Sequence, residues 1–163
     1  MVRGGLGDAG AVRRAVLEAE RHYERFRTGE EPPWLGFYTE AGFATDLGRC
    51  LRTGDADRAA KLITRALDSV EPWKVSGRCA IQTDIAITHL LGRRDLEQAA
   101  AHGRDALRTT AEVSSTRTLD GLRTLQRQVR SLCSASPHLA DLDERITDFV
   151  TRTTRRHQQD NEL

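Results

Sequence analysis

The chain has 163 residues, 38% of them hydrophobic, with 2 Trp, 2 Tyr and 4 Phe as its aromatic residues, and its 25 lysines and arginines nearly balance 24 aspartates and glutamates. A chain of this length buries roughly two thirds of the surface that its unfolded form exposes, so we expect one domain that folds without disulfides or a metal. The net charge of +1 argues against wholesale nucleic-acid binding. The lack of an apolar leader, and of any run near the roughly 18 apolar residues of a membrane helix, predicts a cytoplasmic protein.

The first predicted helix covers residues 8–28. Asp8 suits its N-cap, Gly29 ends it, and apolar residues at helical spacing form one stripe along it. The stripe consists of Val12, Ala15, Val16, Ala19, Tyr23 and Phe26. A second helix, over residues 34–52, is apolar around most of its circumference, which predicts a buried helix that ends at Gly54.

The rest of the chain also predicts helices. Its prolines leave long stretches rich in Ala, Leu and Arg, which are strong helix formers, and no segment alternates apolar and polar residues as a strand would. Further helices are expected over residues 55–70, 75–92, 95–111, 116–134 and 138–156. The predicted fold is therefore all-α with about seven helices. It comprises a flexible N-terminus (1–10), a helical-repeat domain (11–156) and a polar C-terminal tail (157–163).

An internal repeat of 40 residues relates two helical hairpins. Five residues recur at this spacing: Asp55, Ala59, Ala60, Ala66 and Leu67 return as Asp95, Ala99, Ala100, Ala106 and Leu107. Small residues seven apart share one helix face and let a neighbouring helix approach, so the alanine pairs 59/66 and 99/106 are predicted at close helix contacts. A looser third pair is formed by the apolar residues of 122–132 and 139–150. Ala19 and Phe26 of the first helix lie 40 residues before Ala59 and Ala66, so this helix corresponds to the second helix of an upstream repeat.

Two patterns resemble known families. Gly54-Asp55 followed by Ala59 and Ala66-Leu67, with its copy from Arg94-Asp95 to Ala106-Leu107, resembles the second-helix signature of tetratricopeptide repeats, lengthened from their period of about 34 residues. A narrower pattern over roughly residues 11–132 is similar to the C-terminal region of actinobacterial helix-turn-helix transcriptional regulators. It consists of Trp34-Leu35-x-Phe37-Tyr38-x-Glu40-Ala41, Leu47-Gly48-x-Cys50-Leu51 and Ser115-x-Arg117 leading into Leu122 and Leu125.

The resemblance implies a tetratricopeptide-like solenoid of stacked antiparallel hairpins, whose concave surface serves recognition. It further implies a regulatory part of a transcription-control system that binds a partner protein, a peptide or a small effector. Those regulators carry an N-terminal DNA-binding domain, for which the residues before Ala11 leave no room. We therefore expect no sequence-specific DNA binding by this chain alone.

Residue types that carry catalysis form no motif. The five histidines include neither HExxH nor a pair at i, i+4, and neither a phosphate-binding glycine loop nor a GxSxG elbow is present. Cys50, Cys79 and Cys133 are too widely spaced for a metal or redox motif, and we expect them to act as small buried hydrophobes. The sequence thus predicts a non-enzymatic protein without a metal or cofactor.

Asp84 stands out because it lies in the apolar helical segment 80–87, where an unpaired carboxylate is costly to bury. In the tetratricopeptide frame, Asp84 and Thr88 belong to the face that lines the concave groove. One hypothesis makes Asp84 a structural residue paired with Arg123 or Arg127 on the neighbouring helix. The other makes it the centre of a small-molecule-binding or catalytic pocket, which a deep cavity around Asp84 would favour.

Arg123, Arg127 and Arg130 are spaced i, i+4, i+7 and form one cationic stripe. Together with Asp84 and Thr88, the stripe is a candidate ligand or partner groove for an acidic peptide or a phosphate. The alternative is that the stripe is the solvated face of an amphipathic helix.

The first helix is predicted to mediate a homodimer. Its expected partner helix is missing from the chain, so Val16, Tyr23 and Phe26 would cover their counterparts in a second copy about a two-fold axis. The alternative is that this helix folds back onto residues 34–38.

The remaining aromatic and imidazole side chains are predicted to be structural. Trp34 and Trp73 each follow a proline at the mouth of a hairpin, and we expect them to pack over helix ends. His89 and His102 fall within or beside the repeat seams, where we expect their polar atoms to be satisfied.

Overall fold

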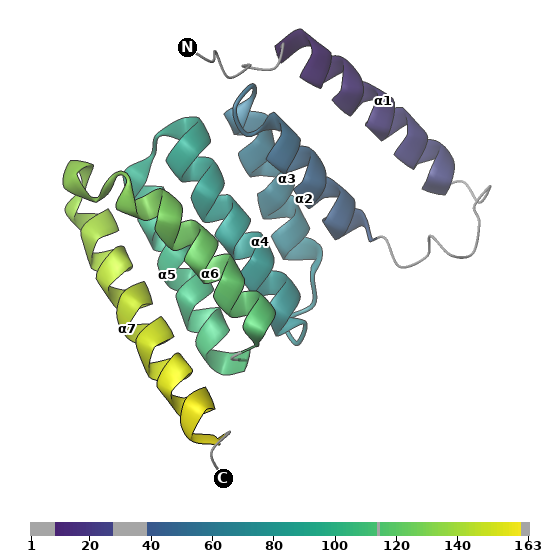
Figure 1. Ribbon diagram of the computed structural model, residues 1–163. Coiled ribbons are helices and arrows are strands. Elements are labelled where there is room, and N and C mark those ends of the chain that lie inside the picture. The colour runs from purple at the N-terminus through teal and green to yellow at the C-terminus, as the bar shows by residue number, and fades with distance from the viewer. Residues whose placement is uncertain (1–8, 28–38, 114, 161–163) are drawn as a thin grey trace, which may run out of the picture.

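The computed structural model describes residues 9–27, 39–113 and 115–160, and within these ranges the chain is helical without a strand (Figure 1). The seven α-helices of this part are α1 (Ala9–Arg27), α2 (Glu40–Leu51), α3 (Ala56–Ser69), α4 (Val75–Ile87), α5 (Leu96–Val113), α6 (Thr116–Arg130) and α7 (Pro137–Asp160). A π-helix (Thr88–Arg93) continues α4, and a 3₁₀ turn (Cys133–Ala135) separates α6 from α7. The predicted all-α fold class is confirmed.

Helices α3 and α5 begin at capping aspartates that the sequence repeats. The carboxylate of Asp55 accepts a hydrogen bond from the Arg58 amide at the start of α3. Asp95, 40 residues later, accepts one from the Gln98 amide at the start of α5. Because a cap satisfies an otherwise unpaired amide in the first turn, the repeated aspartate has the same physical role in both copies.

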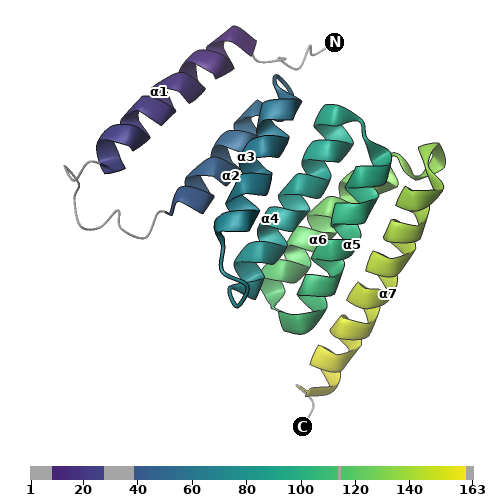
Figure 2. The same ribbon diagram turned by 180° about the vertical axis from the view of Figure 1, so that it is seen from behind.

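Three helical hairpins, α2/α3, α4/α5 and α6/α7, lie side by side in two layers. The first helices of the hairpins, α2, α4 and α6, lie nearer the viewer in Figure 1, and α3 and α5 lie nearer in the reverse view of Figure 2, with α7 at the edge of the stack in both views. The first layer forms one broad face and the second layer the opposite face, so the two faces present different side chains to solvent.

Small residues lie where helices pack most closely. The four alanines predicted at seams are buried, namely Ala59, Ala66, Ala99 and Ala106. Glycines allow still closer packing between helices: a Cβ atom added to Gly48 would lie 2.3 Å from Ile63, and one added to Gly103 would lie 2.5 Å from Leu142. These contacts bring α2 onto α3 and α5 onto α7, and they account for a tight core that holds few aromatic residues.

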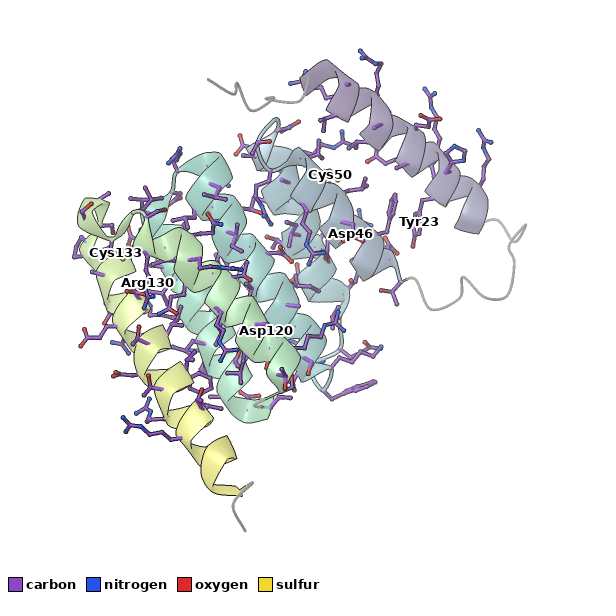
Figure 3. All side chains as sticks on the ribbon, in the orientation of Figure 1. Tyr23, Asp46, Cys50, Asp120, Arg130 and Cys133 are labelled. Atoms are coloured by element: carbon purple, nitrogen blue, oxygen red, sulfur yellow. The ribbon has the colours of Figure 1, made fainter. Side chains whose placement is uncertain are left out.

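Helix α1 packs on the first hairpin. Val16 is buried in a cluster with Leu47 and Leu51, and the ring of Tyr23 stacks on Phe43 with centroids 3.9 Å apart. Figure 3 shows Tyr23 pointing from α1 toward α2. The premise that the apolar stripe of α1 is uncovered is therefore wrong for Val16 and Tyr23, which are used within the chain. The Phe26 side chain and residues 34–38, the alternative cover, lie outside the described residues, and the homodimer stays a prediction.

The predicted helix over residues 8–28 agrees with α1 to within one residue at each end. Two predicted domain bounds differ: α1 begins at Ala9, within the segment 1–10 expected to be flexible, and α7 continues to Asp160 through the first residues of the expected polar tail. Among the described residues, no helix is both long and apolar enough to span a bilayer.

Candidate functional site

An ion-pair cluster joins α2 to α4. Arg49 donates from Nε and Nη2 to Asp84 Oδ2 at 3.0 and 2.6 Å, and Arg52 donates from Nη2 to Asp84 Oδ1 at 2.9 Å. The two arginines lie three residues apart, so both project from one face of α2 toward α4. The Asp84 carboxylate therefore accepts three charge-assisted hydrogen bonds in a nearly buried position.

Thr88 extends this cluster along α4. Its hydroxyl accepts from Arg52 Nε at 3.1 Å and donates to the Asp84 carbonyl at 2.8 Å. The hydrogen bond to Asp84 raises the pKa of the Arg49 guanidinium above its usual value. Asp84, Thr88 and the two arginines thus hold α2 against α4. The buried Thr88 hydroxyl bonds to Arg52 and Asp84 of the same chain and does not line an open groove.

The predicted partners of Asp84 were wrong. Both arginines that bind it come from α2, before it in the chain, whereas Arg123 pairs with Asp120 and Arg127 donates to Thr124, both within α6. Asp84 is turned toward α2 because arginines there reach it across the interface of consecutive hairpins. The hypothesis of a structurally paired carboxylate holds with different partners.

The cationic stripe on α6 is exposed and does not meet Asp84. Arg130 donates to Asp143 at 3.0 Å and to Thr147, so it is turned toward α7. Figure 3 shows Asp120 and Arg130 on α6. The five predicted groove residues therefore divide into two groups. Asp84 and Thr88 belong to the buried cluster between α2 and α4, whereas Arg123, Arg127 and Arg130 lie on an exposed face of α6. The predicted single groove is not formed by them.

A groove that the sequence did not indicate runs between α2 and α4. It encloses about 640 Å³ and reaches the start of α6 at Arg117. Its apolar lining comes from Ala41, Val70, Ala80 and Ile81, and its charged lining from Glu40, Asp46, Arg49, Glu71, Lys74 and Arg117. Arg49 is part of this wall, and Asp84 lies behind it. We call this feature the α2/α4 groove.

Trp73 lies in the loop between α3 and α4, between two residues that line the α2/α4 groove. Its side chain is 72% exposed, and the Lys74 ammonium is 5.0 Å from the ring centroid. Lys74 and Glu71, which flank the tryptophan, both line the groove. The prediction that Trp73 packs over a helix end was therefore wrong. An exposed tryptophan is unusual on a free surface and common where a partner binds.

Two histidines stack where α4 becomes the π-helix. The rings of His89 and His102 have centroids 5.2 Å apart, and burial lowers the pKa of both imidazoles. For His89, the charges of His102 and Arg93 lower the pKa further, while Asp95 opposes them. His89 Nδ1 has no hydrogen-bond partner within the described part of the chain, so the prediction of satisfied histidines is wrong for His89. The described residues form no group of three or more His, Cys, Asp or Glu side chains able to hold a metal ion.

Comparisons with known proteins give no match: no protein-family model, no curated protein and no solved structure matches this chain. The features that bear on function are therefore those of the molecule itself: the α2/α4 groove, the exposed Trp73 in the loop that lines part of it, and the ion-pair cluster that holds Arg49 in its wall.

Proposed function

We propose that this chain is a non-enzymatic recognition module that binds a short peptide segment of a partner protein in the α2/α4 groove. The observation that carries the proposal is the exposed indole of Trp73, in a loop whose Glu71 and Lys74 line a groove with apolar residues. Tryptophan contributes strongly to binding because it buries a large apolar surface and keeps one hydrogen-bond donor.

The lining of the groove suits a peptide better than a compact, uniformly charged ligand. Acidic and basic side chains both line the groove, in part as the pairs Asp46–Arg49 and Glu71–Lys74, and Arg117 makes no hydrogen bond or ion pair with the rest of the described chain. A peptide backbone offers both donors and acceptors to such a wall, while its apolar side chains enter the floor. The groove therefore favours a partner of mixed polarity, with one or two apolar anchors.

The ion-pair cluster supports this function by setting the width of the groove. Arg49 lines the groove and is held by Asp84 from α4 and by Asp46 from its own helix. A carboxylate that already accepts three arginine hydrogen bonds is poorly placed to bind a substrate or to act as a base, because each new contact would displace a charge-assisted one. Asp84 thus acts as a positioning residue in this proposal, in preference to the alternative of a catalytic pocket.

The biological setting rests on the sequence resemblance. The segments around Trp34 and Leu47, which resemble regulators of transcription, lead us to propose the regulatory part of a cytoplasmic transcription-control system. The bound peptide would come from a protein partner, and DNA contact would be made by another domain or protein. In gel-shift titrations at physiological salt, this chain should not distinguish an operator-like site from random duplex.

A display selection with matched glycine variants tests the groove. Gly77 lines the groove on α4, and an added Cβ would meet only Val70, at an ordinary 3.9 Å, whereas Gly54 in the turn after α2 has open space. Random peptides displayed on phage are selected on the wild-type protein and challenged with Gly77→Gln and Gly54→Gln. Enriched peptides should lose binding to Gly77→Gln alone. A selection that enriches no peptide, or peptides that bind both variants equally, would contradict the proposal.

A further inference from the structure

A second groove lies on the opposite face of the molecule, where α5 and α7 run side by side (Figure 2). It encloses about 530 Å³. Each helix contributes residues spaced i, i+3, i+4, i+7, so each set shares one helix face. The lining consists of Arg104, Leu107, Arg108 and Ala111 from α5, and Arg145, Asp148, Phe149 and Arg152 from α7. We call this feature the α5/α7 groove.

The α5/α7 groove combines an excess of arginine over acidic residues in its lining with an apolar floor. Four arginines and one aspartate line it, although the whole chain carries a net charge of only +1. Leu107 and Phe149 are only partly buried against the core, so they present apolar surface between the arginines. Positive walls around an apolar floor are complementary to a ligand that has carboxylates on both sides of an apolar stripe.

The arginines of this groove make exposed ion pairs or none. Arg145 donates from Nε to both carboxylate oxygens of Asp141, at 2.8 and 2.9 Å, in an exposed i, i+4 pair on its own helix. Arg108 pairs with Asp105 on its own helix, in a pair whose side chains are well exposed. Arg104 lies 3.7 Å from Asp141, and Arg152 makes no hydrogen bond or ion pair within the described residues. Exposed pairs of this kind contribute only about 0–1 kcal/mol, so an incoming carboxylate can replace them.

We propose that the α5/α7 groove binds an acidic amphipathic helix of a partner protein. Two neighbouring helices already form the walls, and a third helix laid between them places apolar residues at i, i+4 and i+7 on Leu107, Ala111 and Phe149. Its glutamates or aspartates then face the arginines on either wall. The apolar floor and the inclusion of Asp148 favour this ligand over a nucleic-acid backbone, which offers phosphates and no apolar stripe.

The probe for this surface is a fluorescein-labelled peptide of about 14 residues, built from glutamate with leucine at i, i+4, i+7 and i+11. Fluorescence anisotropy with the full chain should show saturable binding that weakens as salt rises. Replacing every glutamate of the probe by glutamine, or every leucine by serine, should weaken binding at least about tenfold, which corresponds to roughly 1.4 kcal/mol.

Matched charge reversals locate the binding surface. Arg108→Glu with Arg152→Glu changes the α5/α7 groove, and Arg123→Glu with Arg127→Glu makes the same change of net charge on α6. The first pair should weaken binding at least tenfold and should bind a lysine-for-glutamate version of the probe, and the second pair should bind as the wild type does. Circular dichroism establishes that each variant is folded.

Three results would overturn this proposal. One is a folded wild-type protein that does not bind the acidic probe. Another is probe binding that the α6 reversal removes and the α5/α7 reversal leaves intact. The third is binding to duplex DNA or to phosphatidylglycerol vesicles that exceeds binding to the probe and is lost in the α5/α7 reversal. None of these results bears on the α2/α4 groove, which lies on the other layer of helices.

Discussion

Substitution of Asp84 by asparagine tests the ion-pair cluster that fixes the α2/α4 groove. The change keeps the shape of the side chain and removes the charge that Arg49 and Arg52 share. Removing one partner of a buried ion pair typically costs about 3–5 kcal/mol, because the other charge is left buried. Arg49 is 48% exposed and can turn to water, and Arg52, at 16% exposed, keeps its bond to Thr88. We therefore expect Asp84→Asn to lower the free energy of unfolding by about 2–3 kcal/mol.

The matched control is Asp46→Asn. Asp46 also binds Arg49, but as an exposed i, i+3 pair on one helix, which predicts a loss of about 0.5 kcal/mol or less. Urea unfolding followed by circular dichroism at neutral pH gives both values. A double variant with Arg52→Gln should cost less than the sum of the single changes, since the two side chains interact directly. A loss below about 1 kcal/mol for Asp84→Asn, or equal losses at both aspartates, would refute the assigned role of the cluster.

Three further predictions follow from packing and titration. Gly92→Ala places a Cβ 2.5 Å from a backbone carbonyl at the end of α2, so it should cost about 1–3 kcal/mol, whereas Gly77→Ala should stabilise by about 0.5–1 kcal/mol; equal urea midpoints would contradict both. Ala99→Leu should cost about 1–3 kcal/mol through overpacking of a buried seam, and an unchanged melting curve would count against that seam. The folded pKa values of His89 and His102 are lowered, so the unfolded chain binds more protons. The contribution of these histidines to the free energy of unfolding should be fully present above the usual histidine pKa of about 6.5 and should fall as the pH drops below it. A double His89→Phe, His102→Phe variant should show a smaller loss of stability between pH 7.5 and 5. A loss equal to that of the wild type would exclude this pair as the cause.

Local sequence signals predicted the helices well. Proline and glycine punctuation divides the chain, and the aspartates at positions 55 and 95 cap equivalent helices. The alanines spaced by seven residues correctly identified close helix contacts, because small side chains buried along one helix face recur at helical spacing in the sequence. These features depend on residues close together in the chain.

The candidate site could not be predicted in the same way, because it depends on contacts between hairpins. The sequence marked Asp84 as a costly buried carboxylate, but did not tell which neighbouring helix supplies its arginines. The available signal for these partners was the pair Arg49 and Arg52, which lie about one helical turn apart and so share one face of α2. That helix was interpreted as apolar around most of its circumference, and the pair was not singled out. The exposure of Trp73 depends on how the loop between α3 and α4 leaves the surface, which side-chain type alone does not reveal.

The most direct test of the α2/α4 groove is calorimetric titration of a peptide selected on the wild-type protein into three proteins: the wild type, Gly77→Gln and Gly54→Gln. The added glutamine at position 77 occupies the groove without a backbone clash, and the one at position 54 projects into open space. We predict a dissociation constant at least about tenfold weaker for Gly77→Gln, or roughly 1.4 kcal/mol, and an unchanged value for Gly54→Gln. Equal affinity for all three proteins would contradict recognition in this groove.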